Sequence, residues 1–240
     1  MTDRILGVLG GMGPLASAHF MVRLTQLTPA STDQEHIPTV LWSDPRIPDR
    51  TAASSGAGDP WPKMLRGIQG LVAAGCGAIV VPCNTAHGWY ENMVAGAGVP
   101  VLHIVDAAAH ALAKVAASGS KVAVVGTGRT LRMRLYQDRL EPRGWTVLVP
   151  DASEMERLVS PAIAMVKANR VTEAYAPLAE MVEILAGRGA AAVVLGCTEI
   201  PLAMQAGPSS RLPVPLVDTI DALAIAAIAW SRAGNWTSVT

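Results

Sequence analysis

The chain has 240 residues, enough for one large domain or for two of ordinary size. Half of the residues are hydrophobic and 16% are charged, a balance that provides a sizeable core and excludes global disorder. The formal net charge is zero and no run of basic residues occurs, so nothing indicates a surface for nucleic acid.

Short Val/Ile/Leu runs alternate with Ala-rich helical stretches along the chain, which predicts an α/β fold of parallel strands flanked by helices. A core that is poor in aromatic residues and rich in small aliphatic ones suits strands covered on both faces. In chain order, the predicted strands are residues 5–9, 39–42, 78–81, 101–103, 122–125, 146–149, 192–195 and 216–217.

The second half of the sequence repeats the pattern of the first, at a spacing of about 115 residues. The matching segments are 6–10 with 122–126, 78–83 with 192–197, and 99–102 with 214–217. These three collinear matches predict two similar α/β lobes, 1–115 and 116–225, which share elements near their end. A helix end and a tail are expected over 226–240.

Ligands of open α/β sheets bind at the carboxyl ends of the strands, so the residues there are the candidates for a site. Two of these residues are cysteines at matching positions of the repeat, Cys83 and Cys197. Their neighbours and the other strand ends supply candidate substrate contacts, namely Met12, Asn84, Thr85, Thr127 and Thr198. Hydroxyl, amide and backbone N–H groups of this kind can hold the carboxylate and ammonium of an amino acid.

Each cysteine precedes a helix-like segment, where the helix dipole favours a thiolate. Repeat symmetry would place the two thiols facing each other across a cleft between the lobes. Inverting a stereocentre needs this arrangement, because one group removes the α-proton and another delivers a proton to the opposite face. The two thiols would then occupy opposite protonation states with coupled titrations. The sequence therefore predicts racemisation.

Four motifs resemble the aspartate/glutamate racemase family, over about residues 4–228. They are the segments 10–16, 47–52, 82–87 and 195–202. The resemblance implies two α/β lobes, no cofactor and a homodimer. It also implies that Arg50 and Lys167 meet the second carboxylate of the substrate, with aspartate ahead of glutamate. Cys197 would take the proton from the L-form and Cys83 from the D-form.

Side-chain specificity is left open, because the segment 54–61 departs from close aspartate racemases. Decarboxylation of a malonate or cis–trans isomerisation of a dicarboxylate also stays possible. The Gly11-x-Gly13-x-x-Ala16 pattern fits a dinucleotide-binding oxidoreductase, although this hypothesis leaves both cysteines unexplained. A two-lobed protein that binds a small acid without turnover is a further alternative.

Several residues have a simpler interpretation as structural groups. Either catalytic candidate taken alone could be a buried cysteine, and Cys76 is expected to serve packing only. His87 either raises thiolate character near Cys83 or caps and packs a helix, and both interpretations stay open. His103, inside an apolar strand, is expected to be a core residue. No Cys/His spacing matches a zinc site.

The expected setting is the cytoplasm. No apolar stretch reaches the roughly 20 residues that a membrane helix needs. The N-terminus lacks the pattern of a signal peptide, and three cysteines cannot all pair with one another. We therefore expect free thiols, a small-molecule amino-acid substrate, and no nucleic-acid or membrane partner.

Overall fold

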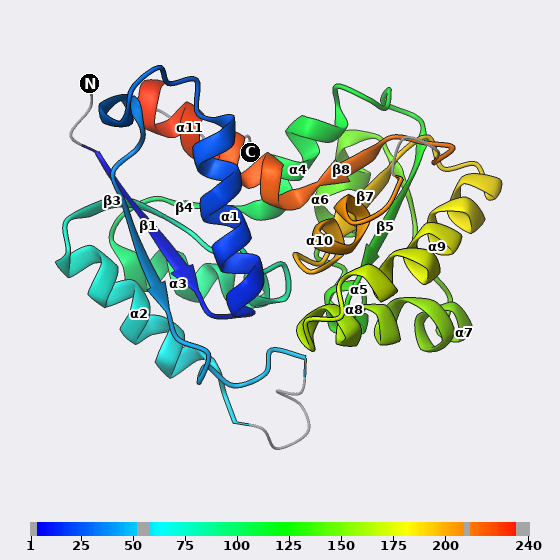
Figure 1. Cartoon of the computed structure of the whole chain (residues 1–240), viewed down its shortest axis with the longest axis horizontal. Coiled ribbons are helices and arrows are strands. Elements are labelled where there is room, and N and C mark those ends of the chain that lie inside the picture. Colours follow the sequence, from blue (N-terminus) through cyan, green and yellow to red (C-terminus); the bar gives the residue numbers. More distant parts are fainter. Residues whose placement is uncertain (1–3, 52–57, 209–211, 234–240) are drawn as a thin grey trace. The chain divides into compact units, whose positions relative to one another are not determined.

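The computed structural model describes residues 4–51, 58–208 and 212–233 (Figure 1). The chain divides into two compact units. The first unit comprises the described residues up to Ala107 together with those from Ile220 onward, and the second unit is Ala108–Thr219. Each unit contains one four-stranded parallel sheet with helices around it, so the predicted α/β class is confirmed.

The first unit holds four strands and the helices around them. The strands are β1 (Ile5–Gly10), β2 (Thr39–Ser43), β3 (Cys76–Val80) and β4 (Val101–Leu102). The helices are α1 (Pro14–Leu27), η1 (Asp33–Glu35), α2 (Trp61–Ala73), η2 (Thr85–Trp89) and α3 (Tyr90–Ala97), where η marks a short non-α helix. Helix α4 (Ile104–Leu112) is divided between the two units, and α11 (Thr219–Ala233) lies in the first unit apart from its first residue.

The second unit is built in the same way. Its strands are β5 (Lys121–Gly126), β6 (Thr146–Leu148), β7 (Val193–Gly196) and β8 (Leu216–Asp218). Its helices are α5 (Gly128–Arg132), α6 (Gln137–Leu140), η3 (Glu141–Arg143), α7 (Ala152–Glu154), η4 (Met155–Val159), α8 (Ser160–Lys167), η5 (Thr172–Ala174), α9 (Tyr175–Gly187) and α10 (Ile200–Gln205).

The two sheets have equivalent strand orders, β2-β1-β3-β4 and β6-β5-β7-β8, with every neighbouring pair parallel. Strand β1 therefore corresponds to β5 and strand β3 to β7, as the repeat predicted. All eight predicted strands are present, with ends that differ by two residues or fewer from the predicted ones. In each sheet, the strands that precede the cysteines pair with the central strands, β3 with β1 and β7 with β5.

The central strands are buried along almost their whole length, which explains their continuous apolar sequences. Leu6 and Val8 of β1 have no exposed surface, and neither does Val124 of β5. Helix α2 covers β1, β2 and β3 in the first unit. In the second unit, helices α8, α9 and α10 surround β5 and β7 (Figure 1). Their apolar side chains share one buried cluster with those of the two strands.

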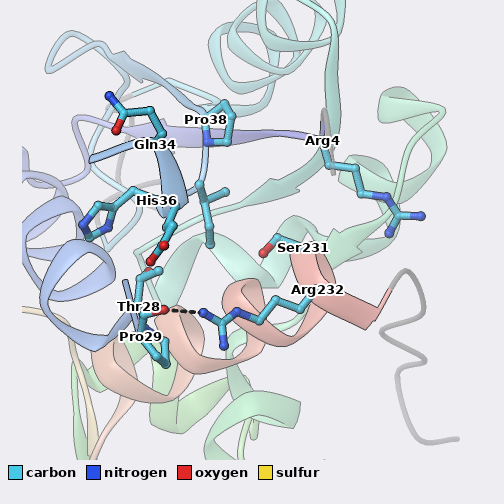
Figure 2. Close-up of a pocket in the computed structure, with 10 residues that line it drawn as sticks. Arg4, Thr28, Pro29, Gln34, His36, Pro38, Ser231 and Arg232 are labelled. Atoms are coloured by element: carbon cyan, nitrogen blue, oxygen red, sulfur yellow. Dashed lines mark hydrogen bonds between the residues drawn. The ribbon is translucent and has the colours of Figure 1, made fainter. Parts of the chain in front are cut away.

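Helix α11 belongs to the first unit, and its polar contacts show why. Arg23 of α1 holds Asp221 in a two-pronged ion pair, with N···O distances of 2.6 and 2.7 Å. The Arg4 guanidinium lies 5.7 Å above the ring of Trp230. Arg232 donates to the carbonyl of Pro29 at 2.6 Å (Figure 2).

The division of the chain therefore differs from the predicted limits at 115 and 225. Those limits followed the repeat alone, whereas the contacts place Ala108 in the second unit and Ile220 in the first. Of the segment 226–240, residues beyond 233 lie outside the described part. Among the helices of the described residues, none is both long enough and apolar enough to span a membrane.

Candidate functional site

Cys83 lies just beyond the carboxyl end of β3, in a segment that leads into η2. Its N–H donates to the carbonyl of Val81 at 2.8 Å, which turns the chain away from the sheet. The residue is 6% exposed and shares an apolar cluster with Met12 and Ile47. The loops after β1 and β2 thus meet the loop after β3, and the structure brings the predicted residues Met12 and Cys83 into one cluster.

The loop after β1 has its own reason to be rich in glycine. Gly11 has a φ of +87°, and a Cβ atom there would lie 2.5 Å from the backbone of Asp44. Ser17 fixes this loop from the first turn of α1, because its hydroxyl accepts from Gly11 N–H at 2.9 Å and donates to Gly13 O at 2.8 Å. Close contact between two loops therefore accounts for Gly11 without a bound dinucleotide.

Arg50 is buried, with 9% of its surface exposed, and it also belongs to this region. Its Nη1 donates to the carbonyls of Ile47 and Pro48 at 3.2 and 2.8 Å. Its Nε atom is buried and has no hydrogen-bond partner among the described residues. An N–H without a partner on a buried guanidinium has the geometry and charge to donate to a carboxylate. Residues 52–57 of the divergent segment 54–61 lie outside the described part.

His87 is buried, and both of its ring nitrogens face backbone groups. Its Nε2 accepts from the N–H of Ile104 at 3.2 Å, so this nitrogen carries no proton. Its Nδ1 lies 2.9 Å from the carbonyl of Cys83 and is therefore the protonated nitrogen that donates to it. The neutral ring ties the loop of Cys83 to the start of α4, which favours the structural interpretation of this residue.

Replacing His87 by alanine is expected to destabilise the protein by about 2–4 kcal/mol, because the Ile104 N–H and the Cys83 carbonyl lose their partner while buried. Denaturant unfolding followed by circular dichroism measures the change. The matched control is His110→Ala, at an exposed position on α4. Equal stability of the two variants would contradict the structural role of His87.

His103 is buried as expected for a core residue, and its ring lies between those of His87 and Tyr90. Cys76 is also buried, and a Cβ atom on Gly7 would lie 3.1 Å from its Cβ. Burial raises the pKa of the Cys76 thiol, which keeps it protonated. Cys76 begins β3, at the end of the strand opposite to Cys83, so the structure supports its role in packing.

Cys197 follows β7 as Cys83 follows β3, and it is 4% exposed. Gly126 and Gly196, at the ends of β5 and β7, allow these two strands to approach each other closely. A Cβ atom on Gly126 would lie 2.6 Å from the carbonyl oxygen of Gly196, and one on Gly196 would lie 2.9 Å from Cγ1 of Val124. The backbone that carries Cys197 therefore has little freedom to move toward β5.

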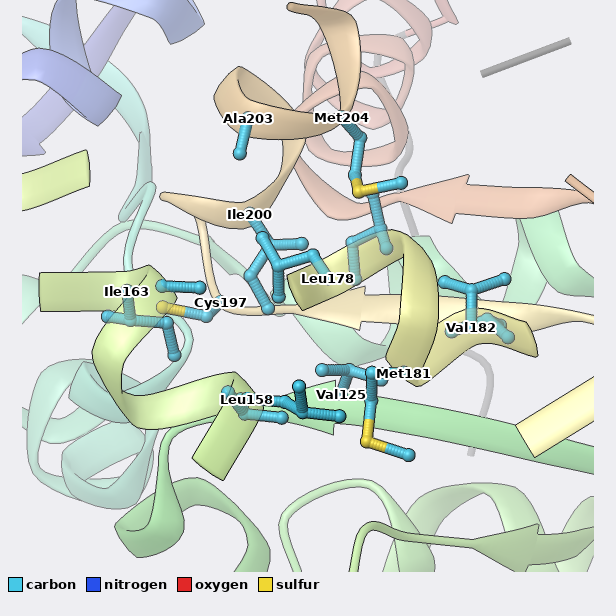
Figure 3. Packing of buried hydrophobic residues seen from close by; sticks show 14 of the residues in the cluster. Val125, Leu158, Ile163, Leu178, Met181, Val182, Cys197, Ile200, Ala203 and Met204 are labelled. Atoms are coloured by element: carbon cyan, nitrogen blue, oxygen red, sulfur yellow. The ribbon is translucent and has the colours of Figure 1, made fainter. Parts of the chain in front are cut away.

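Two further predicted residues flank this strand end. Thr127 begins α5 as its N-cap, and its hydroxyl accepts from the N–H of Thr130 at 3.2 Å. Thr198 is 1% exposed and directly follows Cys197. Lys167 ends α8 and is exposed, one turn after Ile163, which packs beside Cys197 (Figure 3). The structure therefore groups Thr127, Thr198 and Cys197 at neighbouring strand ends of the second unit.

The sequence did not predict the contact that Cys197 makes with Glu199. The thiol donates to Glu199 Oε2 at 3.0 Å, and the hydroxyl of Thr198 donates to the same oxygen at 3.4 Å. Glu199 is 5% exposed, so its carboxylate is buried beside the thiol. A signal was present, since Thr85 occupies the matching position of the repeat and the two halves differ there.

A buried tyrosine lies behind the same strand end. Tyr136 has no exposed surface, and its ring lies close to Gly196: a Cβ atom on Gly196 would lie 3.2 Å from Cε2 of Tyr136. Burial, and secondly the charge of an ionised Cys197, raise the pKa of Tyr136, whereas its hydrogen bond to Thr219 lowers it. The hydroxyl of Thr219 in turn donates to the carbonyl of Leu195 at 2.8 Å. The tyrosine is therefore neutral beside Cys197.

A cavity of about 550 Å³ in the first unit is a separate feature (Figure 2). Its lining includes Arg4, which precedes β1, and Arg232 near the end of α11. It therefore lies at the amino end of β1, opposite to the strand end that leads to Met12. None of the predicted site residues lines it.

Comparison with known proteins decides the family. A profile of the Asp/Glu/Hydantoin racemase family matches residues 9–227. The chain belongs to this family. It is accordingly an enzyme of the isomerase class, which confirms the resemblance noted from the motifs and leaves the oxidoreductase and binding-protein alternatives without support.

Individual relatives agree with this assignment. The solved structure of an aspartate racemase from Picrophilus torridus matches with a TM-score of 0.82 and 31% identity, over 96% of this chain and 95% of that one. The broad specificity amino-acid racemase RacX of Bacillus subtilis is 26% identical over 225 residues, 92% of this racemase and 95% of its relative. A glutamate racemase of Deinococcus radiodurans is 33% identical over 174 residues, 70% of this chain and 53% of that protein.

Proposed function

We propose that this racemase inverts the α-carbon of an amino acid without a cofactor, with Cys83 and Cys197 as the two proton-transfer groups. The observation that carries the proposal is the pair of buried thiols at equivalent ends of β3 and β7. One thiol, as thiolate, removes the α-proton and becomes a thiol. The other delivers its proton to the opposite face of the carbanion and becomes a thiolate, so the reaction is balanced and leaves the roles exchanged.

The carbanion needs stabilisation of the negative charge that spreads onto the α-carboxylate. Asn84, Thr85 and Thr198 are proposed to supply it, because these buried polar groups flank the two thiols. Hydrogen bonds held in a site that excludes water are stronger toward developing charge than those in solution. Met12 and Thr127, at the ends of β1 and β5, are proposed to complete the substrate contacts.

For the substrate we propose a dicarboxylic amino acid, aspartate ahead of glutamate. The buried Nε donor of Arg50 supports a second carboxylate, and Lys167 is proposed to share it. The match to an aspartate racemase favours aspartate. A broader range is the second candidate, because RacX is a broad specificity enzyme.

The test is exchange of the α-proton in deuterated water across a panel of amino acids, followed by chiral analysis. We expect aspartate to incorporate deuterium and racemise faster than glutamate, alanine and serine. A malonate derivative and a cis-dicarboxylate belong in the same panel. Turnover of either of these without exchange on any amino acid would replace the proposal by the decarboxylase or isomerase alternative.

Substrate choice is tested by Arg50→Ala and Lys167→Ala. Each variant is expected to reduce aspartate turnover at least about tenfold more than any residual turnover of alanine, because the second carboxylate loses a charged partner. Steady-state kinetics with both substrates measures the difference. Arg46→Ala is the matched control, an exposed arginine that pairs with Asp44 at 2.8 Å.

Equal losses on aspartate and alanine would mean that Arg50 supports the loop rather than the substrate. This outcome has a physical basis, since Arg50 also donates to Ile47 O and Pro48 O. Thermal unfolding of each variant separates the two effects. A loss confined to aspartate with an unchanged melting temperature supports the carboxylate contact.

Cofactor independence is tested by removal. Because the proton-transfer chemistry is assigned to thiols of the chain, we expect full activity after exhaustive dialysis against a chelator and after treatment with hydroxylamine. The measurement is racemisation before and after each treatment, with reducing agent present to protect the thiols. Activity that returns only with added metal or pyridoxal phosphate would contradict the proposal. The cytoplasmic setting and the homodimer stay predictions.

A further inference from the structure

The residues two positions after the two thiols differ in charge. Cys197 donates to the buried carboxylate of Glu199 at 3.0 Å, whereas the equivalent position after Cys83 is the neutral Thr85. Among the described residues no cation forms an ion pair with Glu199, and its hydrogen-bond donors there are the Cys197 thiol and the Thr198 hydroxyl. The carboxylate therefore depends on the thiol proton for one of its two hydrogen bonds.

Three other side chains beside Cys197 carry no charge, namely Tyr136, Ile163 and Ile200. Tyr136, the titratable side chain behind Gly196, is buried and neutral. The side chains that pack against Cys197 from α8 and α10 are the apolar Ile163 and Ile200 (Figure 3). Ionising Cys197 would place a second negative charge beside the first in an apolar setting and would remove a hydrogen bond from Glu199.

We propose that Glu199 is a positioning residue that keeps the proton on Cys197 in the unliganded enzyme, so that Cys83 is the resting thiolate. The proposal rests on the two-thiol function above. Before substrate binds, the two thiols share one proton, and the charge of Glu199 keeps this proton on Cys197. On the face assignment given by the family resemblance, the resting enzyme is the form that accepts the D-enantiomer. The form that accepts the L-enantiomer is reached when the proton moves from Cys197 to Cys83.

Titration of single-cysteine proteins tests the proposal directly. Cys76→Ala with Cys83→Ser leaves Cys197 as the sole thiol, and Cys76→Ala with Cys197→Ser leaves Cys83. The ultraviolet absorbance of the thiolate gives the midpoint of each titration. We expect Cys197 to titrate at higher pH than Cys83. A Cys197 midpoint at or below that of Cys83 overturns the proposal without any change at Glu199.

The variant Glu199→Gln then isolates the charge, because glutamine keeps a hydrogen-bond acceptor of the same shape. It is expected to lower the Cys197 midpoint by at least about one pH unit. Glu199→Asp keeps the charge and should leave the midpoint above that of the glutamine variant. Glu173→Gln is the matched control in the second unit, an exposed carboxylate that pairs with Arg170. An unchanged or raised midpoint in Glu199→Gln, or an equal shift in Glu173→Gln, overturns the proposal.

Turnover supplies a second readout. The two enantiomers have equal free energies in water, so kcat/KM is equal in both directions at every pH. Glu199→Gln is therefore expected to move the alkaline limb of this common profile to lower pH. Because the titration needs no substrate, failure to racemise any amino acid would sink the proposed function and leave the test of Glu199 standing. A Cys197 midpoint that does not shift in Glu199→Gln would overturn the proposed role of Glu199 and leave the proposed racemisation standing.

Discussion

Cys83→Ala and Cys197→Ala are each expected to reduce racemisation by at least about 1,000-fold, because one remaining thiol cannot both remove a proton and deliver one to the opposite face. The measurement is the rate of change of optical rotation or of chiral composition, started from each enantiomer. Both thiols are small and buried, so their truncation removes one sulfur atom from an otherwise complete cluster.

The matched control is Cys76→Ala, which removes the third buried thiol at the opposite end of β3. It should keep activity close to that of the unmodified protein. Circular dichroism and thermal unfolding of all three variants show whether the fold survives. Wild-type turnover of both enantiomers by either Cys83→Ala or Cys197→Ala would end the two-thiol mechanism.

The second large effect concerns the face that each thiol serves. A substrate with chloride on its β-carbon can lose the α-proton and chloride together, and this elimination needs only one base. We expect Cys83→Ser to retain elimination from a β-chlorinated L-amino acid and to lose it for the D-form. Cys197→Ser should show the mirror result. Chloride release from each enantiomer is the measurement.

Three outcomes separate the ideas. The expected pattern supports two thiols on opposite faces of the α-carbon, with Cys197 as base for the L-form. Exchanged preferences keep the two-base mechanism and change only the assignment of faces. Elimination from the same enantiomer by both variants would mean that the thiols do not act on opposite faces.

The sheets could be predicted from sequence because buried parallel strands carry continuous apolar runs. The sequence of β1 is apolar apart from its glycines, and five of its six residues are buried, so its pattern has few alternatives. The limits of these apolar runs predicted where the strands end, and so placed Cys83 and Cys197 just after strand ends. Repeat symmetry made the pair of cysteines meaningful, since a single buried cysteine indicates little.

Contacts that break the repeat could not be predicted in this way. The bond from Cys197 to Glu199 depends on a side-chain orientation that no periodicity encodes. The two backbone bonds of His87 likewise join residues of different elements, including Ile104 of α4. Helix α11 resembles the end of a second lobe in sequence, yet its Asp221 finds Arg23 on α1. In each of these cases, the contact depends on how side chains meet in the folded protein, which the repeat in the sequence does not specify.

The return of α11 to the first unit fixes an order for folding during synthesis. The second unit is contiguous, so its whole sheet leaves the ribosome before α11 has been made. The first unit is split around it, and Arg23 of its α1 helix can form the ion pair with Asp221 only after α11 has been made. Because chain segments fold as they emerge, the unit that begins the chain is the one that closes last.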